Sequence, residues 1–144
     1  MPIQGPSLSL RILICGTPQS GKTTLAKGLA SELPNCAVIH GDDFMHLPWA
    51  EQKEALRDAV VATEGNLIVE GCNAVRVLRY DLGFNLVIEA RTAQLKKEWL
   101  GMAKMTKNKL AEWGGDYCLY HMSQFMKVVA EVKTMMKQRR KENE

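Results

Sequence analysis

The sequence predicts an α/β fold in which a parallel sheet is covered by helices on both faces. Short apolar runs that suit buried strands alternate with segments whose apolar residues recur at helical spacing, and this alternation is typical of such a sheet. The first apolar run leads directly into a glycine-containing loop. At 144 residues, with 46% hydrophobic side chains, the chain is expected to form one domain with one sizeable core.

The expected strands occupy residues 8–15, 36–40, 66–70 and 84–90, so we expect a sheet of about four strands. Leu25, Leu29 and Leu33 lie four residues apart, which predicts one stripe of a helix that ends before Pro34. Further helices are expected over 49–63, from about 93, and in a long last segment to about 140. The predicted core face of the last segment consists of Met122, Phe125, Met126, Val129, Val132 and Met136.

The loop between the first strand and the first helix reads GTPQSGKT, which fits the phosphate-binding pattern G-x-x-x-x-G-K-T. Its glycines let the backbone curl so that successive N–H groups face phosphate oxygens, and the helix that follows adds its positive N-terminal dipole. Lys22 is expected to reach the β- and γ-phosphates of ATP, and the Thr23 hydroxyl to ligate Mg²⁺. The expected nucleotide-binding residues are Gly16, Thr17, Pro18, Gln19, Ser20, Gly21, Lys22, Thr23 and Thr24.

Acidic residues stand at the ends of the second and third expected strands. Asp42 follows the second strand, where its carboxylate is predicted to accept the proton of an attacking hydroxyl, whereas Asp43 is expected to cap a helix. Glu70 ends the third strand and is expected to order the hydration shell of the magnesium ion. His40 and His46 have no well-spaced third ligand and are expected to be ordinary polar residues.

The stretch GTPQSGKTTLAKGLASELPNCAVIHGDDF resembles the opening of the nicotinamide riboside kinases and, more distantly, of the uridine kinases. NLIVEG resembles their third strand, and WGGDYCLYHMSQF faintly resembles the segment that follows their lid. The resemblance implies a catalytic Asp42 that activates the acceptor hydroxyl, Lys22 on the ATP phosphates, and Thr23 with Glu70 around Mg²⁺. It also implies a short lid over about residues 96–115.

The chain departs from this family in two places. The segment after Asp-Asp-Phe is shortened to MHLPWAE, so Trp49 is predicted to form an aromatic wall of the acceptor pocket, while Ala50 offers no carboxylate. The alternative for Trp49 is packing onto its own helix. The lid contains lysines where the family has arginines, and no apolar strand follows it, which leaves the usual adenine-side wall without a counterpart.

The leading prediction is an ATP-dependent kinase that transfers the γ-phosphate to a hydroxyl of a nucleoside-like small molecule. The alternative is a module that binds or hydrolyses nucleotide for regulation or assembly, and a kinase for nucleic-acid 5′ ends comes third. A net charge of only +3 argues against a nucleic-acid surface. The scattered cysteines predict reduced thiols. Because no membrane-spanning run and no cleavage site are visible, we expect a cytoplasmic protein. Residues 1–7 are expected to be flexible. The acceptor and the oligomeric state stay open.

Overall fold

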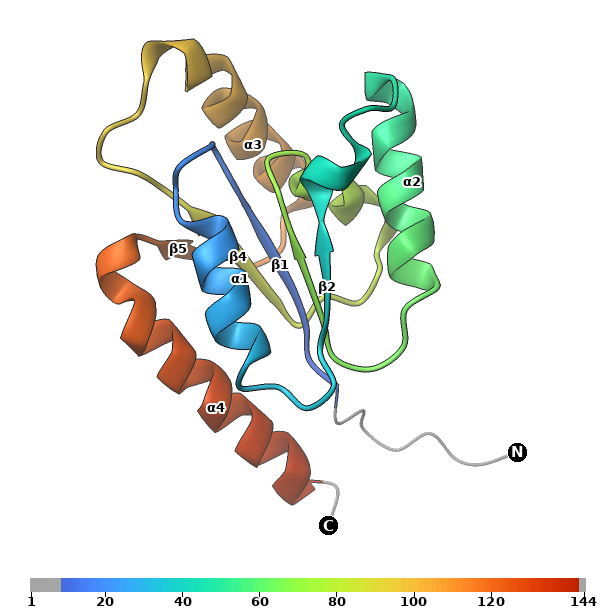
Figure 1. Cartoon of the computed structure of the whole chain (residues 1–144), viewed down its shortest axis with the longest axis vertical. Coiled ribbons are helices and arrows are strands. Elements are labelled where there is room, and N and C mark those ends of the chain that lie inside the picture. The colour runs from blue at the N-terminus through green and yellow to red at the C-terminus, as the bar shows by residue number, and fades with distance from the viewer. Residues whose placement is uncertain (1–8, 143–144) are drawn as a thin grey trace.

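The computed structural model describes residues 9–142, so the expectation of a flexible segment over 1–7 lies outside the described part of the chain. Figure 1 shows the arrangement of its strands (β), α-helices (α) and 3-10 helices (η). In chain order these are β1 (Arg11–Gly16), α1 (Lys22–Ala30), β2 (Ala37–His40), η1 (Gly41–Phe44), α2 (Trp49–Val61), β3 (Leu67–Glu70), η2 (Ala74–Tyr80), β4 (Leu86–Ala90), η3 (Lys97–Trp99), α3 (Leu100–Trp113), β5 (Cys118–Tyr120), η4 (Met122–Gln124) and α4 (Phe125–Glu142).

The sheet has five parallel strands in the order β2-β3-β1-β4-β5. The predicted parallel α/β sheet is confirmed, but the expected strand number of about four is wrong. The additional strand, β5, has three residues and pairs with the end of β4 through Ile88 and Ala90. Only Tyr120 of β5 is buried, and Leu119 is 51% exposed. At three residues, this edge strand is too short for its apolar residues to indicate a strand in the sequence.

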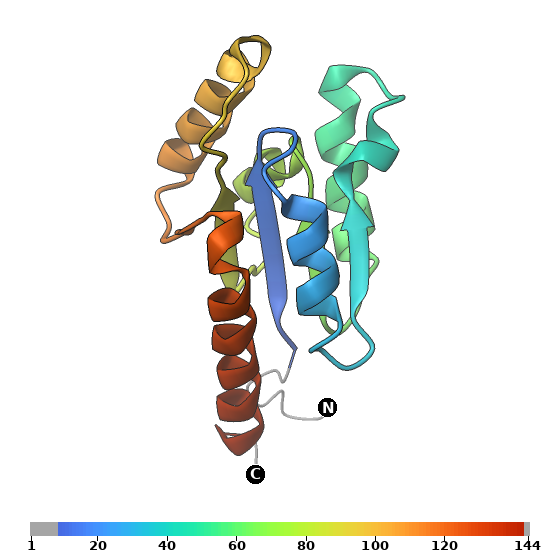
Figure 2. The ribbon, with the colours of Figure 1, turned by 60° about the vertical axis from the view of Figure 1, so that its left-hand side comes forward.

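Helices cover both faces of the sheet, as Figures 1 and 2 show, and the molecule has three layers. Strand β1 lies at the centre, where its side chains alternate between the two faces. Ile12 and Ile14 join the apolar cluster formed with α1 and α4. Leu13 and Cys15 join the opposite cluster, formed with α2, η2 and α3. Within residues 9–142, no helix is long and apolar enough to cross a membrane.

The predicted core face of the last helix is confirmed except at Met122 and Met126. Val132 and Met136 of α4 are buried, and Phe125 and Val129 pack partly buried against the same cluster. Met126, however, is 75% exposed, and Met122 belongs to η4 instead. Met122 is outside the helix because a capping box between His121 and Gln124 starts a separate 3-10 turn before α4. Met126 lies outside the stripe of α4 that packs on the core through Phe125 and Val129.

The parallel sheet brings the functional ends of its strands to one edge, because all five strands point the same way. In the register of the sheet, His40 at the end of β2 pairs with Glu70 at the end of β3. Gly16 at the end of β1 pairs with Ala90 at the end of β4. The phosphate-binding loop and the acidic strand ends therefore share this edge.

Candidate functional site

The loop between β1 and α1 has the backbone form that a phosphate requires. Gly16 (φ 140°) and Gly21 (φ 88°) occupy backbone regions that favour glycine. Gly16 also lies so close to β4 that a Cβ there would come within 2.2 Å of the Ala90 carbonyl oxygen. Lys22 begins α1 and is 7% exposed. Its Nζ donates a hydrogen bond to the Thr17 carbonyl oxygen at 2.5 Å, so its charge is held against the loop.

The remaining predicted loop residues surround this lysine. Thr17 and Ser20 are buried, and the Ser20 hydroxyl donates to the Thr17 carbonyl oxygen at 2.7 Å. The side chains that face solvent are those of Gln19, Thr23 and Thr24, while Pro18 is half-buried. The curled backbone and the lysine fit the phosphate groups of a nucleotide.

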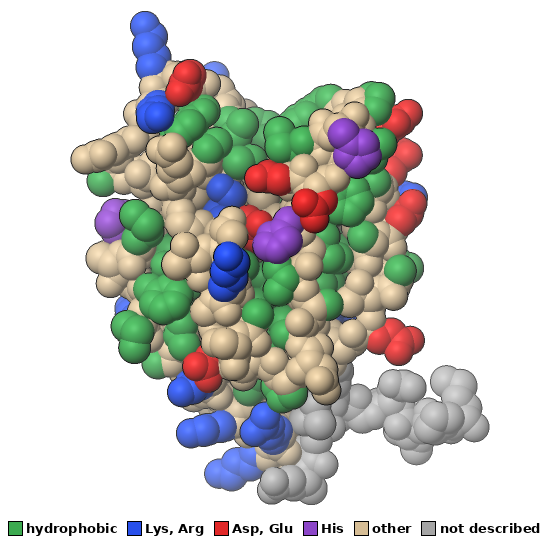
Figure 3. All heavy atoms as spheres, viewed as in Figure 1, with side chains coloured by type: hydrophobic (Ala, Val, Ile, Leu, Met, Phe, Trp, Pro, Cys, Tyr) green, Lys and Arg blue, Asp and Glu red, His purple; other side chains and the backbone are tan. Residues whose placement is uncertain are grey.

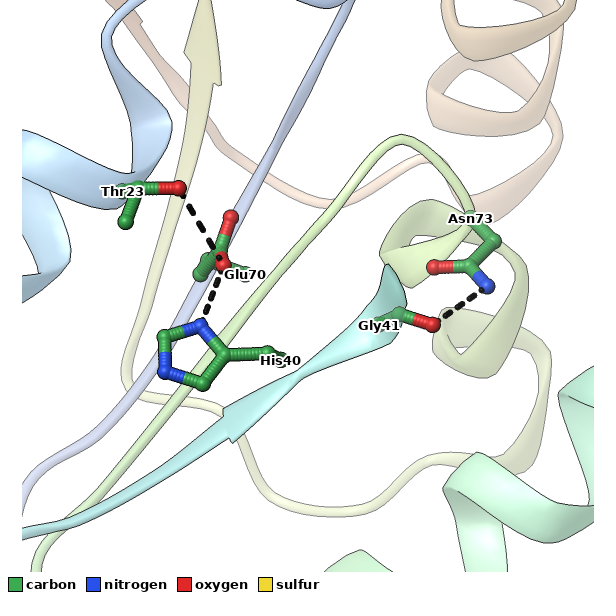
Figure 4. A network of polar contacts seen from close by, with 5 residues as sticks. All are labelled: Thr23, His40, Gly41, Glu70 and Asn73. Atoms are coloured by element: carbon green, nitrogen blue, oxygen red, sulfur yellow. Dashed lines mark hydrogen bonds and ion pairs between the residues drawn. The ribbon is translucent and has the colours of Figure 1, made fainter. Parts of the chain in front are cut away.

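Glu70 connects the phosphate-binding loop to β2, as Figure 4 shows. The Thr23 hydroxyl donates to Glu70 Oε2 at 3.5 Å, and His40 Nδ1 lies 2.5 Å from the same oxygen. Glu70 is only 4% exposed. A threonine hydroxyl and a carboxylate are hard oxygen ligands of the kind that Mg²⁺ takes, so these two residues fit that ion. Within residues 9–142, no group of three His, Cys, Asp or Glu side chains could hold a metal by itself.

The contact of His40 with Glu70 was not foreseen from the sequence, which predicted an ordinary polar histidine. The signal that could have found it is the pairing of β2 with β3, because that register places the two residues side by side.

Asp42 and Asp43 lie in η1, directly after β2, and both are exposed. The predicted cap role of Asp43 is wrong, because His40 is the N-cap of η1 and Pro48 is the N-cap of α2.

The Cys72 thiol, two residues after Glu70, is influenced by three charged side chains near the phosphate-binding loop. Burial raises the pKa of this thiol, and the charge of Lys22 lowers it. The charges of Asp42 and Glu70 raise the same pKa. All three charged groups therefore lie within electrostatic range of one sulfur atom. Sequence reasoning missed Cys72, although its position two residues after Glu70, just past a strand end, was visible.

Asn73 fixes the position of η1. Its side-chain amide donates to the Gly41 carbonyl oxygen and to Gln52 Oε1, both at 3.0 Å (Figure 4 shows the first bond). Asn73 is 3% exposed, and Gln52 lies in α2. One buried amide thereby ties together η1, α2 and the start of η2, and it holds the backbone that precedes Asp42.

A cavity of about 340 Å³ lies beside the phosphate-binding loop, between Gly16 and Thr17 of the loop, the end of β4, and α3. Glu89 is buried on its wall, paired with Arg91 at 2.8 Å. Lys104 and Lys107, which belong to the predicted lid, also line this cavity. Most of the segment 96–115 forms η3 and α3, and its closure over a ligand stays a prediction.

The turn after β5 packs against the phosphate-binding loop. Met122 of η4 packs against the phosphate-binding loop so closely that a Cβ on Gly21 would lie 2.7 Å from its Cγ. Strand β5 and η4 therefore occupy the side of the loop opposite η1, where no counterpart was expected from the sequence.

Trp49 is the first residue of α2 and is 54% exposed. The Arg76 guanidinium of η2 lies over its ring, 3.9 Å from the ring centroid. Trp49 lines a second cavity, of about 810 Å³, between α2, η2 and α3. Figure 3 shows a notch at the upper edge of the molecule between α3 and α2, with acidic and histidine side chains below it.

The parallel sheet and the phosphate-binding loop define a P-loop NTPase fold. A family model described as an AAA domain matches residues 12–112, more than half of the chain, so the chain belongs to this family. The solved shikimate kinase from Bacteroides thetaiotaomicron is similar in fold, with a TM-score of 0.58 and 16% sequence identity. That likeness covers 89% of this chain and 98% of the shikimate kinase chain.

Two curated relatives match over short segments. Nicotinamide riboside kinase 1 of Homo sapiens is 64% identical over 31 residues, which is 22% of this chain and 16% of the human protein. Nicotinamide riboside kinase 2 of Mus musculus is 54% identical over 37 residues, or 26% of this chain and 19% of the mouse protein. The matched segments thus span less than a fifth of either relative.

Proposed function

We propose that the protein is an ATP-dependent kinase that transfers the γ-phosphate to a hydroxyl group of a nucleoside-like small molecule. The observation that carries the proposal is the phosphate-binding loop with its buried Lys22, which lies beside the hydrogen-bonded pair Thr23 and Glu70 at the edge of the sheet where Asp42 follows β2. A cation for phosphates, a carboxylate for magnesium and a second carboxylate for a hydroxyl proton are what phosphoryl transfer requires. The similarity to nicotinamide riboside kinases supports the same class of reaction.

In the proposed reaction, Asp42 accepts the proton of the acceptor hydroxyl. The hydroxyl oxygen forms a bond to the γ-phosphorus as the bond between that phosphorus and the β–γ bridging oxygen breaks, and ADP leaves with the electron pair. Lys22 and the loop N–H groups stabilise the negative charge on the phosphate oxygens. Thr23 and Glu70 would hold Mg²⁺, which neutralises phosphate charge when bound.

Trp49 is proposed to form one wall of the acceptor site. Its exposed ring lies at the start of α2, in the cavity that α2 shares with η2 and α3. Arg76 occupies one face of the ring, which leaves the rest of the ring to contact a planar group. Stacking of a base on an aromatic side chain contributes about 1–3 kcal/mol in nucleic-acid sites.

A module that binds or hydrolyses nucleotide without an acceptor is the second candidate. It is favoured by Lys104 and Lys107 on the cavity beside the loop, because lysine supplies charge but not the two-pronged contact of arginine. The role of Asp42 distinguishes the two candidates, since a module without an acceptor needs no base for a hydroxyl.

The test is ATP turnover with Mg²⁺ against a panel of nucleosides, with Asp42→Asn compared with the wild type. A base acting in the transition state contributes roughly 10²–10⁴ in rate, so Asp42→Asn should lose acceptor phosphorylation while ATP binding changes little. Asp43→Asn is the matched control, because the neighbouring carboxylate is also exposed and is given no catalytic role. Phosphorylation at the wild-type rate by Asp42→Asn would refute the assigned base.

A further inference from the structure

The cavity that contains Trp49 is rich in positive charge. Four cationic side chains line it: Lys53 of α2, Arg76 and Arg79 of η2, and Lys109 of α3. A second tryptophan, Trp113, lines the same cavity. Its volume of about 810 Å³ is in the range of small-molecule sites.

Most of this charge is not neutralised by the protein. Lys109 pairs with Glu112 at 3.3 Å. Within residues 9–142, no ion pair is formed by the other three cations, Lys53, Arg76 and Arg79. The remaining acidic group of the cavity, Asp81, is exposed.

Arg76 is the most informative of these cations because it is only 9% exposed. It lies over the Trp49 ring and donates to the Trp49 carbonyl oxygen at 2.7 Å, and neither group carries a negative charge. Burial also lowers the pKa of Arg76. Burying a cation without a counter-charge is costly, so an anion bound in this cavity would supply what the protein lacks.

The cavity is close to the proposed catalytic base. Asn73 bonds to the Gly41 carbonyl, directly before Asp42. Arg76 follows Asn73 by three residues in η2, a rise of roughly 6 Å along a 3-10 helix at ~2 Å per residue. A ligand of nucleotide size that contacts Arg76 is therefore within reach of the edge of the sheet that holds Asp42.

We infer that the acceptor is anionic: a nucleoside-like alcohol that carries a phosphate or carboxylate group, bound by Lys53, Arg76 and Arg79 while its ring contacts Trp49. This inference rests on the proposed function and narrows its substrate class. The hydroxyl that receives the phosphoryl group lies at the other end of the molecule, toward Asp42. Neutral nucleosides would leave the three cations without a partner.

The experiment compares neutral and anionic probes that share a free 5′-hydroxyl. Uridine and adenosine are paired with their 3′-monophosphates, and orotidine serves as the carboxylate counterpart of uridine. Binding is measured by calorimetry without ATP, and turnover is measured separately with Mg²⁺ and ATP. Because contacts to charged groups are stronger than neutral ones, at least one anionic probe should bind about tenfold or more tighter than its neutral partner. The preferred anion is the one, carboxylate in orotidine or phosphate in the monophosphates, that gives the larger gain in affinity over the neutral nucleoside.

The double variant Lys53→Gln/Arg79→Gln tests the cavity without touching buried Arg76. It should remove most of the preference for anionic probes and leave the affinity for neutral probes within about twofold. Arg57→Gln/Lys127→Gln is the charge-matched control, because neither side chain lines the cavity, and it should keep the preference. ATP binding is measured in both variants to show that they are folded.

Equal affinity for charged and neutral probes, absence of binding by every anionic probe, or the same loss in both double variants would overturn the inference. Its failure is distinguishable from failure of the proposed function. If neutral nucleosides are turned over as efficiently as their anionic partners, the proposed kinase activity is supported and the anionic acceptor is refuted. Charge-dependent binding with no turnover of any probe supports the anion site and contradicts the kinase.

Discussion

At the residue scale, Lys22 should dominate nucleotide affinity. Its ammonium is nearly buried and donates to the Thr17 carbonyl and the Ser20 hydroxyl, both neutral. A charge-assisted hydrogen bond contributes about 1.5–3 kcal/mol, so Lys22→Ala should weaken ATP binding at least about tenfold. Calorimetry measures the change, with Lys27→Ala as the control because this exposed lysine lies on the same helix. Unchanged affinity in Lys22→Ala would rule out the phosphate role.

The Cys72 thiol can report on the charges around it. Asp42 raises the pKa of Cys72 and Lys22 lowers it, and the thiolate is the species that reacts with iodoacetamide. In a background with Cys36 and Cys118 replaced by serine, Asp42→Asn should therefore speed alkylation of Cys72 at pH 8, and Lys22→Ala should slow it. Asp43→Asn, the control, should leave the rate near that of the background. If the two variants change the alkylation rate in the opposite directions, Asp42 does not act on the Cys72 thiol as proposed.

Much of this site could be predicted from single residues, and the rest depends on pairing between distant segments. The phosphate-binding loop is defined by the spacing of Gly16, Gly21 and Lys22, which is local in the chain. The contact between His40 and Glu70 requires the register of two strands that lie 30 residues apart. The charge around Arg76 requires three helices to meet. No local pattern contains that information.

At the scale of elements, the predicted strands and helices agree with the structure where an element is buried. β1, β3 and β4 are largely buried apolar runs, and α1 carries its leucine stripe into the core. β5 was missed because an edge strand of three residues buries only Tyr120. Met122 was wrongly assigned to the core face of the last helix because the turn at His121 places it in η4, before α4 begins.

Asn73 should control the placement of η1 relative to the loop. Asn73→Ala removes two buried hydrogen bonds, to Gly41 and Gln52, and should lower the free energy of unfolding by about 1–3 kcal/mol. Because the backbone before Asp42 loses its anchor, acceptor turnover should fall more than ATP affinity does. Urea denaturation and steady-state kinetics measure the two effects. Asn108→Ala, on the exposed surface of α3, should change neither, and equal turnover in both variants would contradict the anchoring role.

At the scale of the whole molecule, stability rests on the central strand. Residues Ile12 to Cys15 of β1 are all 0% exposed, and they connect the apolar cluster under α1 and α4 with the one under α2, η2 and α3. The three-layer architecture predicted from the sequence follows from this strand, because both of its faces need covering. The burial of this strand also makes the free energy of unfolding depend on pH, because Cys15 lies at the centre of the fold.

Cys15 should make the folded state lose stability in alkaline solution. Burial, and then the charge of Glu89, raise the pKa of its thiol from 9.0 to about 12. Below pH 9 the thiol is protonated in both the folded and unfolded states and contributes no pH dependence. Between pH 9 and 12 the unfolded chain releases the proton and the folded chain keeps it, so the free energy of unfolding should fall by about 1.4 kcal/mol per pH unit from this group.

Cys15→Ala lacks the thiol and should show a correspondingly shallower decline over that pH window, although the small cavity it leaves lowers stability at every pH. Cys118→Ala removes an exposed thiol and should reproduce the wild-type slope. Urea denaturation at several pH values between 8 and 11 measures these slopes. Because lysine and tyrosine titration affects all three proteins alike, the difference in slope between Cys15→Ala and Cys118→Ala isolates the buried thiol. Equal slopes would mean that Cys15 ionises in the folded protein as readily as in the unfolded chain, and that this face of β1 is reached by water.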